Sequence, residues 1–280
     1  MKFASLKTGK PVIVTESGII PLIDAGFSGD LKSFIELGNQ SRNEVIAKAM
    51  QSKLQAIPPM SEFDAPLRNP GKLIAIGLNY IDHAAESKMT LPENPLIFTK
   101  FNSSITGPID PIKIPTDLTK EVDYEVEFGV VIGKKAKNVS LDEALNYVFG
   151  YTVINDVSAR DLQFVDKQWV RGKSLDTFCP MGPVIVTADE IKDPQNVEIG
   201  CDVNGQILQR ANTRDMIFSV AVLISELSKS FTLNPGDIIA TGTPSGVGFS
   251  RVPPIYLKPG DSMRTWVEGV GELNNIIEKV

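Results

Sequence analysis

The sequence predicts an α+β fold that is rich in β-strand, with a small N-terminal unit ahead of a larger body. Short β-branched runs recur between Gly, Pro and Asp residues, whereas helical periodicity is confined to a few segments. A Pro-rich stretch also separates the first 66 residues from the rest. The 280 residues, 42% of them hydrophobic, are enough for one large domain with a small companion.

The N-terminal unit opens with two short apolar runs, residues 11–14 and 18–23, whose separation by polar residues and glycine is typical of a hairpin. Residues 30–53 follow, with apolar side chains at helical spacing. Prolines and glycine punctuate residues 57–71. We therefore expect an N-terminal domain over 1–66 and a second domain over 67–280.

The larger body consists mainly of expected strands, which are short, β-branched and bounded by Gly, Pro or Asp. These strands are residues 72–76, 124–132, 147–155, 184–187, 197–203 and 237–240. The expected helical segments are residues 82–88, 141–147 and 216–230. Asn204-Gly205, between two apolar segments, predicts a two-residue hairpin turn.

Charge and cysteine content exclude several classes of protein. Lys and Arg total 28 against 34 Asp and Glu, a net charge of −6, which argues against a nucleic-acid or anionic-membrane surface. No apolar stretch approaches the roughly 18 residues that span a bilayer, and the opening residues lack a signal core. Two cysteines make no disulfide framework. We expect a cytoplasmic protein.

Two glutamates share one face of the segment 122–132. In an extended strand, Glu125 and Glu127 point away from the side that carries Val126 and Phe128. Neighbouring buried carboxylates resist ionisation unless a cation neutralises them, and oxygen ligands favour Mg²⁺, Mn²⁺ or Ca²⁺ over zinc. Spacing alone leaves open a solvated strand face with two ordinary glutamates.

A third carboxylate, Asp156, ends the β-branched run 151–155. A side chain at a strand end can face a cleft, so Asp156 can complete a Glu-Glu-Asp site; a helix N-cap or turn aspartate is the alternative. Arg160 and Gln163 follow at i and i+3. They are candidate substrate clamps, or simply one face of a helix.

The only histidine, His83, stands three residues before Glu86, so the two share a face of a helical turn. A carboxylate orients an imidazole and stabilises its protonated form, as a general base requires. An incidental surface pair is the alternative. One His and two distant Cys cannot form a zinc site, and no Gly-x-Ser-x-Gly motif indicates a serine hydrolase.

Lys173 and the Gly-rich residues 241–248 superficially suggest phosphate loops. The first fails because Lys167 stands where that motif needs Gly. In the second, Pro244 removes a backbone donor. A loop that lines a small-anion site and a plain structural turn both remain open for 241–248.

Together, these segments resemble the fumarylacetoacetate hydrolase family, most closely its domain-containing protein 2 subgroup and the bacterial relatives of that subgroup. The matching pieces, in the family's order, are GLNYIDHAAES (77–87), DYEVEFGVVIGKKAKNV (123–139), GYTVINDVSARDLQ (150–163), GKSLDTFCPMGPVIVT (172–187), VNGQILQRANTRDMIF (203–218) and PGDIIATGTPSGVG (235–248). The resemblance covers roughly residues 72–280. It implies a mixed β-sandwich roll, a homodimer and a variable N-terminal unit.

The resemblance also implies roles for nine residues. Glu125, Glu127 and Asp156 match Mg²⁺ or Mn²⁺ ligands, one cation per chain; His83, Glu86 and Lys173 match catalytic positions; Arg160, Gln163 and Thr243 match substrate-contacting positions. One departure is Ile76, which stands where the founding fumarylacetoacetases carry a fourth metal carboxylate.

The expected function is therefore a metal-dependent enzyme that acts on small 2-oxo or 2,4-dioxo acids through a stabilised enolate. C–C bond hydrolysis, as in acylpyruvases, ranks first. The alternatives are enol–keto tautomerisation of oxaloacetate, its decarboxylation, isomerisation of hydroxymuconate-type dienes, and a non-catalytic metabolite-binding protein. The expected partner is a small-molecule acid, with no nucleic acid and no membrane.

Overall fold

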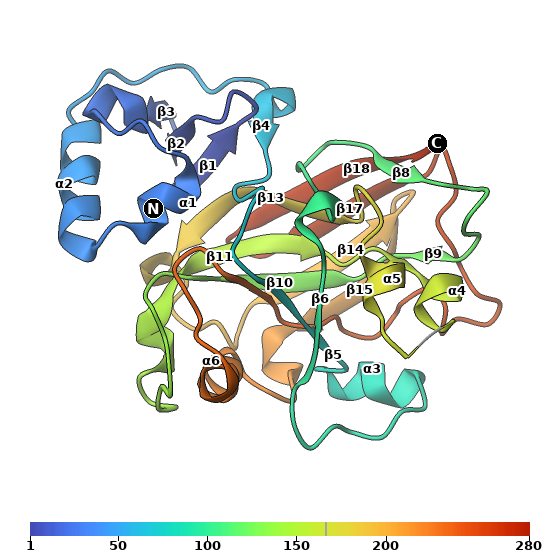
Figure 1. The fold of residues 1–280 in the computed structure, drawn as a ribbon. Coiled ribbons are helices and arrows are strands. Elements are labelled where there is room, and N and C mark those ends of the chain that lie inside the picture. Colours follow the sequence, from blue (N-terminus) through green and yellow to red (C-terminus); the bar gives the residue numbers. More distant parts are fainter. Residues whose placement is uncertain (166) are drawn as a thin grey trace.

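The computed structural model describes residues 1–165 and 167–280, and its larger sheet runs through the whole molecule (Figure 1). The strands of this sheet lie in the order β3-β2-β1-β13-β11-β10-β16-β5-β6, with β4 beside β1 and β7 beside β13. Their bounds are β1 Lys2–Leu6, β2 Pro11–Thr15, β3 Gly18–Pro21, β4 Phe63–Asp64, β5 Leu73–Gly77, β6 Leu96–Thr99, β7 Ile105–Thr106, β10 Val126–Ile132, β11 Val148–Asn155, β13 Cys179–Thr187 and β16 Ile238–Ala240.

A second sheet has the order β15-β14-β17-β18-β8, and β9 pairs with β12 separately. These strands are β8 Ile112–Ile114, β9 Val122–Asp123, β12 Ser158–Ala159, β14 Glu198–Val203, β15 Gln206–Asn212, β17 Ser262–Val267 and β18 Gly271–Lys279. The α-helices are α1 Leu31–Glu36, α2 Asn39–Ala49, α3 Ile81–Glu86, α4 Arg160–Gln163, α5 Val170–Lys173 and α6 Val220–Ser230.

The main core lies between the two sheets. Val126, Phe128 and Val130 of β10 point into it, where Phe128 stacks on Tyr151 of β11 with ring centroids 4.7 Å apart. Ile199 of β14 contributes from the facing sheet. Alternate residues of β10 thus bury one face against the second sheet. This confirms the predicted β-rich α+β fold.

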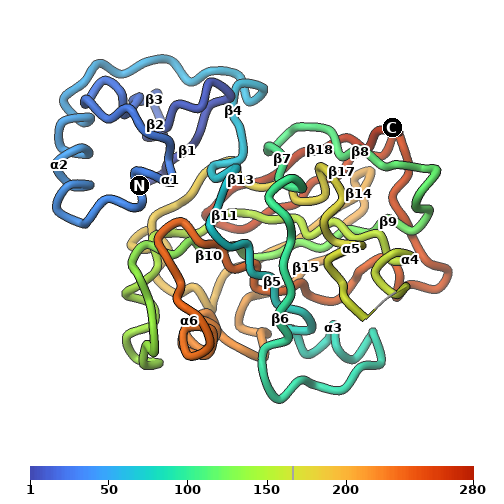
Figure 2. The backbone as a smooth tube through the Cα atoms, viewed as in Figure 1, coloured from blue at the N-terminus to red at the C-terminus, as the bar shows by residue number. Residues whose placement is uncertain are grey.

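The N-terminal unit forms the lobe at the upper left of Figure 1, and its first strand belongs to the main sheet. β1 pairs antiparallel with β13, with Phe3 opposite Ile185. A second core cluster joins Phe3 and Phe34 to Val131 on the other face of β10. Figure 2 shows the chain leaving this lobe beside β4. The division at residue 66 stays a prediction.

Within this unit, the hairpin expected at 11–14 and 18–23 is confirmed as β2 and β3. The helical segment expected over 30–53 is two helices instead of one. Asp30 caps α1 by accepting a hydrogen bond from the Ser33 amide at 2.8 Å, and the chain turns extended at Leu37 and Gly38 before α2 begins.

The strand expected over 124–132 begins two residues later, at Val126 of β10. Tyr124 and Glu125 lie between β9 and β10. Here side-chain oxygens, instead of the backbone carbonyls of a neighbouring strand, accept hydrogen bonds from the backbone amides. The Glu125 amide donates to Asn155 Oδ1 at 3.0 Å, and the Val126 amide donates to Gln209 Oε1 at 3.0 Å. Glu125 therefore lies just before the first residue of β10 and outside the strand.

Other boundaries differ by a few residues. The helix expected over 141–147 is a 3₁₀ turn at Ala144–Tyr147, and the strand expected at 184–187 begins earlier, at Cys179. The helix expected over 216–230 begins at Val220, after the Ser219 side chain caps its first turn. The Asn204-Gly205 hairpin is confirmed, with φ of 53° and 79°. In the described residues, no helix is long and apolar enough to cross a membrane.

Candidate active site

Three buried carboxylates from two neighbouring strands meet at one end of the main sheet. Glu125 precedes β10, Glu127 lies within it, and Asp156 follows β11; their ligand oxygens all lie within 4.8 Å of one another. β10 and β11 are antiparallel, with Val126 opposite Asn155, so the start of one strand meets the end of the other. The exposed fractions of the three residues are 5%, 1% and 0%.

Two cations compensate Glu125. Lys173 Nζ lies 2.8 Å from its Oε2, and Arg160 Nη2 lies 2.6 Å from its Oε1. Burial by itself raises the pKa of Glu125, but the charges of Lys173 and Arg160 outweigh it and lower the pKa to about 2. Burial likewise opposes the charge on Lys173, yet Asp156 and Glu125 leave its pKa raised. The floor of the site is therefore a network of full charges.

Glu127 is the least compensated of the three. Its carboxylate accepts the Gly242 amide at 2.9 Å, and burial together with the charges of Asp156 and Glu125 raises its pKa well above the usual range. A divalent cation among the three carboxylates would relieve this repulsion, and a set of carboxylate oxygens suits Mg²⁺ or Mn²⁺. The triad therefore fits a hard metal ion.

Lys100, just after β6, is a residue that the sequence did not single out. Its Nζ lies 2.6 Å from Asp156 Oδ1 and also donates to the carbonyls of Val157 and Lys173. Its side chain is fully buried. Lys100 thus ties Asp156 to the backbone that carries Lys173.

The Gly-rich loop 241–248 supplies backbone donors to carboxylates of the protein. Besides Gly242 on Glu127, Gly246 donates to Glu86 Oε2 at 2.9 Å and Gly248 donates to Asp123 Oδ1 at 2.7 Å. Gly246 has φ +102°, and a Cβ there would lie 2.1 Å from the carbonyl oxygen of Leu208. These amides hold acids from three segments, so the loop is a structural clamp for the site.

His83 and Glu86 lie on the buried side of α3. His83 Nδ1 and Glu86 Oε1 are 2.8 Å apart, and the second oxygen of Glu86 is held by Gly246. Asn79, just before α3, bonds through its side chain to Thr241 and Phe218 and so anchors the helix to the loop. With Nδ1 bound to Glu86, Nε2 is the imidazole nitrogen left for the pocket.

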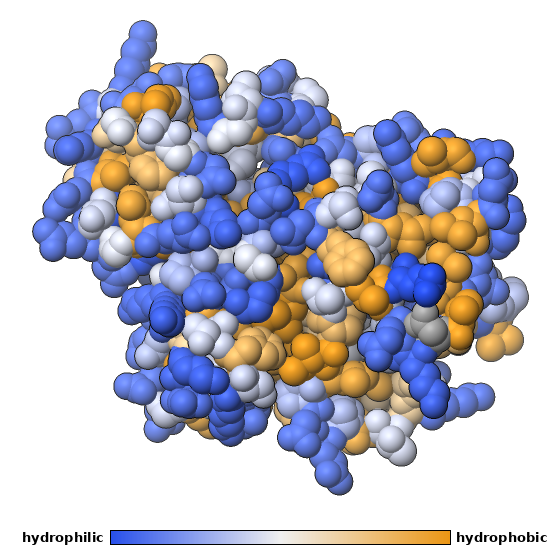
Figure 3. Space-filling model, in the orientation of Figure 1, coloured by the Kyte–Doolittle hydropathy of each residue, from blue (hydrophilic) through white to orange (hydrophobic). Residues whose placement is uncertain are grey.

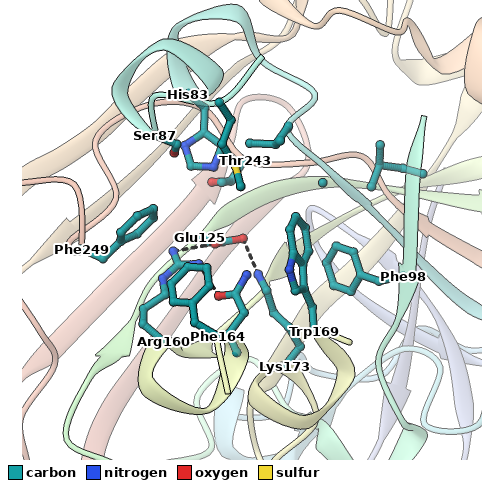
Figure 4. Close-up of a pocket in the computed structure, with 15 residues that line it drawn as sticks. His83, Ser87, Phe98, Glu125, Arg160, Phe164, Trp169, Lys173, Thr243 and Phe249 are labelled. Carbon is teal, nitrogen blue, oxygen red and sulfur yellow. Dashed lines mark hydrogen bonds and ion pairs between the residues drawn. The ribbon is translucent and has the colours of Figure 1, made fainter. Parts of the chain in front are cut away.

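A pocket opens between α3 above and α4 and α5 below (Figure 4). Of the predicted site residues, the structure brings six to its wall: His83, Glu125, Arg160, Gln163, Lys173 and Thr243. Glu127, Asp156 and Glu86 lie behind this lining and contact it. Aromatic side chains, Phe98, Phe164, Trp169 and Phe249, complete the wall.

Arg160 and Gln163 form hydrogen bonds with other residues of the protein. The Arg160 guanidinium bonds to Asp123 and to Gln163 Oε1, each at 2.9 Å, and stacks 4.4 Å from the centre of the Phe249 ring. Thr243 accepts a hydrogen bond from Gln209 at 2.8 Å. Asp123 and Gln209 both stood inside quoted motifs without being singled out, whereas Lys100 lies in none of them and its partners are distant in sequence.

The chain is similar to known proteins over most of its length. Residues 72–278 match the family model described as fumarylacetoacetate (FAA) hydrolase C-terminal. The Xenopus laevis protein named oxaloacetate tautomerase fahd2, mitochondrial, is 47% identical over 249 residues, which cover 88% of this chain and 77% of that protein.

Two solved structures share the fold over the whole of this chain. Fumarylacetoacetate hydrolase from Exiguobacterium antarcticum has a TM-score of 0.85 at 35% identity and is covered over 100% of its length. Maleylpyruvate hydrolase from Sphingobium sp. SYK-6, in complex with manganese(II) and pyruvate, has a TM-score of 0.84 at 31% identity and is covered over 99%.

Proposed function

Because the chain belongs to the fumarylacetoacetate hydrolase family, we propose that it is a Mg²⁺- or Mn²⁺-dependent tautomerase that interconverts the enol and keto forms of oxaloacetate. The observation that carries the proposal is the meeting, around one pocket, of the His83–Glu86 pair and the triad of carboxylates. A proton-transfer group opposite a cation site is the arrangement that an enol–keto interconversion requires.

In this proposal, Glu125, Glu127 and Asp156 hold the metal. When bound, the ion supplies positive charge that polarises the 2-oxo oxygen of the substrate. The ammonium of Lys173 adds charge beside the same position. The manganese in the structure of the Sphingobium protein supports this assignment. That the ion of this chain is Mg²⁺ or Mn²⁺ is part of our proposal.

The protein groups then move one proton. In the enol-to-keto direction, the enol oxygen gives its proton to water and protonated His83 gives one from Nε2 to C3, after which the imidazole regains a proton from water; the reverse reaction runs through the same steps. Glu86 holds Nδ1 and stabilises the imidazolium. Gln163 and Thr243 contact the substrate from the pocket wall, and Arg160 keeps Gln163 in place.

Hydrolysis of a C–C bond, which the sequence ranks first, becomes the second candidate. The Xenopus relative carries the name oxaloacetate tautomerase, the alternative reading, at a higher identity than the hydrolases of the two solved structures. Because the two solved structures are named as hydrolases, C–C cleavage of a 2,4-dioxo acid is the second candidate reaction. Decarboxylation of oxaloacetate is a third outcome of the test below. No reaction with either substrate would favour diene isomerisation or metabolite binding without turnover.

The test is a proton NMR time course with excess Mg²⁺ on freshly dissolved enol-oxaloacetate and on acetylpyruvate. Accelerated enol-to-keto conversion without pyruvate supports the tautomerase. Acetate plus pyruvate from acetylpyruvate would make it a hydrolase, and pyruvate from oxaloacetate a decarboxylase. The Asp156→Ala variant is the control for metal-dependent turnover.

We further propose a homodimer. The edge strand β6 exposes Leu96 and Ile97, and Phe101 follows it on the surface; Figure 3 shows apolar side chains gathered over this part of the molecule. An exposed apolar edge strand favours pairing with a second copy about a two-fold axis. Light scattering should give twice the 30.5 kDa chain mass, and Ile97→Lys should reduce it to one chain. A monomeric wild type would contradict the dimer.

We propose that the protein resides in a reducing compartment of the cell. Cys179 and Cys201 are both free and buried, and burial raises the pKa of the Cys179 thiol to about 12. The sequence predicts the cytoplasm, whereas the name of the Xenopus relative includes mitochondrial. Both compartments are reducing, and fractionation of cells that express the tagged protein distinguishes them.

A further inference from the structure

Ser87 directly follows α3 and lines the same pocket as His83 (Figure 4). The two residues are four apart, so they lie one turn apart on the same side of the helix end. The Ser87 amide donates to the His83 carbonyl at 3.1 Å, which fixes its backbone. Its Oγ is buried and has no hydrogen-bond partner in the described part of the chain.

A buried hydroxyl without a partner is destabilising, and such groups in proteins generally bond to a ligand or an ordered water. A serine hydroxyl can donate one hydrogen bond and accept two. Because Ser87 stands at the pocket wall, the missing partner belongs in the pocket.

The chemistry of the opposite wall indicates what that partner is. Arg160 already bonds to Asp123, Glu125 and Gln163. Lys173 bonds to Glu125 and Asp156. These cations, on the floor of the pocket, are committed to the metal end of the site. A second carboxylate of the substrate, held away from the metal, would therefore need a neutral donor on the α3 side.

The position of Ser87 beside His83 meets that need. If His83 exchanges a proton at C3, the group bonded to C3 lies next to the imidazole and within reach of the neighbouring turn of α3. In a four-carbon 2-oxo diacid, this group is the C4 carboxylate. A hydrogen bond from a hydroxyl to a carboxylate is charge-assisted and stronger than one to a neutral ketone.

We propose that the Ser87 hydroxyl donates a hydrogen bond to the second carboxylate of a four-carbon 2-oxo diacid and so selects the diacid over 2,4-dioxo acids that end in a ketone. This inference rests on the proposed function and names its specificity residue. Ser87 binds the substrate and takes no part in the proton transfer.

The experiment compares wild type, Ser87→Ala and Ser87→Thr with excess Mg²⁺. For Ser87→Ala, we expect KM for enol-oxaloacetate to rise roughly 10-fold, the effect of one lost hydrogen bond to a charged group, with kcat changed less than about twofold. The inhibition constant of oxalate, which has no distal carboxylate, should stay unchanged. Ser87→Thr keeps a hydroxyl and should restore KM.

Three results would overturn the inference. An unchanged KM in Ser87→Ala means that the hydroxyl does not touch the substrate. A parallel rise in the oxalate constant indicates a general disturbance of the pocket. A fall in kcat at constant KM assigns Ser87 to the proton transfer. Failure of the wild type to accelerate enol–keto conversion would instead reject the proposed function, and the inference with it.

Discussion

The Nζ of Lys100 lies 2.6 Å from Oδ1 of Asp156, while Lys173 Nζ lies 2.7 Å from the other oxygen of the same carboxylate. Both lysine side chains are almost completely buried. Lys100 also donates to the main-chain carbonyl of Lys173. One buried cation therefore fixes both a proposed metal ligand and the backbone of a proposed catalytic lysine.

Lys100→Met should lower the free energy of unfolding by about 1–3 kcal/mol, because it leaves Asp156 Oδ1 and two buried carbonyls without their donor while Lys173 still holds Asp156 Oδ2. Urea denaturation measures the loss. The matched control is Lys113→Met, an exposed lysine, which should change stability by less than about 0.5 kcal/mol. Equal stability of the two variants would contradict the structural role of Lys100.

Glu127→Gln should abolish the stabilisation that Mg²⁺ gives, while the metal-free protein melts no lower than wild type. The raised pKa of Glu127, caused by burial and by Asp156 and Glu125, means that its ionised form destabilises the metal-free fold. Because the pKa of Glu127 is higher in the folded protein than in the unfolded chain, the folded protein loses stability as pH rises above the unfolded pKa. The neutral amide of the Glu127→Gln variant does not ionise, so this variant avoids the loss.

The measurement for Glu127→Gln is the melting temperature at pH 7 in EDTA and in excess Mg²⁺. Glu93→Gln, an exposed glutamate, serves as the matched control and should retain the Mg²⁺ response. A Glu127→Gln variant that still gains stability from Mg²⁺ would show that this carboxylate is not a ligand.

His83→Ala should reduce turnover by roughly 10²- to 10⁴-fold, the usual contribution of a positioned acid–base group, without loss of metal binding. Glu86→Gln should also reduce turnover, since the single amide oxygen cannot accept hydrogen bonds from both His83 Nδ1 and the Gly246 amide. Both variants should keep the Mg²⁺-dependent shift in melting temperature. Full activity of His83→Ala would remove this pair from the mechanism.

Asp110→Asn should destabilise the protein at pH 7 by about 1–2 kcal/mol, the worth of charge-assisted hydrogen bonds after allowance for exposed partners. Burial raises the pKa of Asp110, but Lys7 and the Gly107 amide outweigh it and lower the pKa below 3.8. A lowered folded pKa gives stability that is complete above the unfolded value and is lost as pH falls through the folded one.

The difference in urea midpoint between wild type and Asp110→Asn should therefore be constant from pH 5 to 7 and shrink below about pH 4. Lys7 of the N-terminal lobe and Arg68, in the segment that follows the lobe, both form ion pairs with Asp110. A difference that persists unchanged at pH 3 would mean that the charge of Asp110 does not carry the contact.

The sequence by itself predicted the β-rich α+β class, the β2–β3 hairpin and the Asn204-Gly205 turn, because alternation and turn chemistry act between near neighbours. It also proposed nine candidate site residues. Spacing placed Glu125 with Glu127, His83 with Glu86, and Arg160 with Gln163 on common faces, and the end of a strand indicated Asp156. The roles of Lys173 and Thr243 came from the family resemblance.

Only the tertiary structure decided how the site is held. The contacts of Lys100 with Asp156, of Gly246 with Glu86, and of Gln209 with Val126 join residues that are 56, 160 and 83 positions apart. No local pattern encodes such pairs, since each depends on how the sheet orders its strands. The pairing of β1 with β13 has the same origin, as does the burial that leaves Glu127 short of partners.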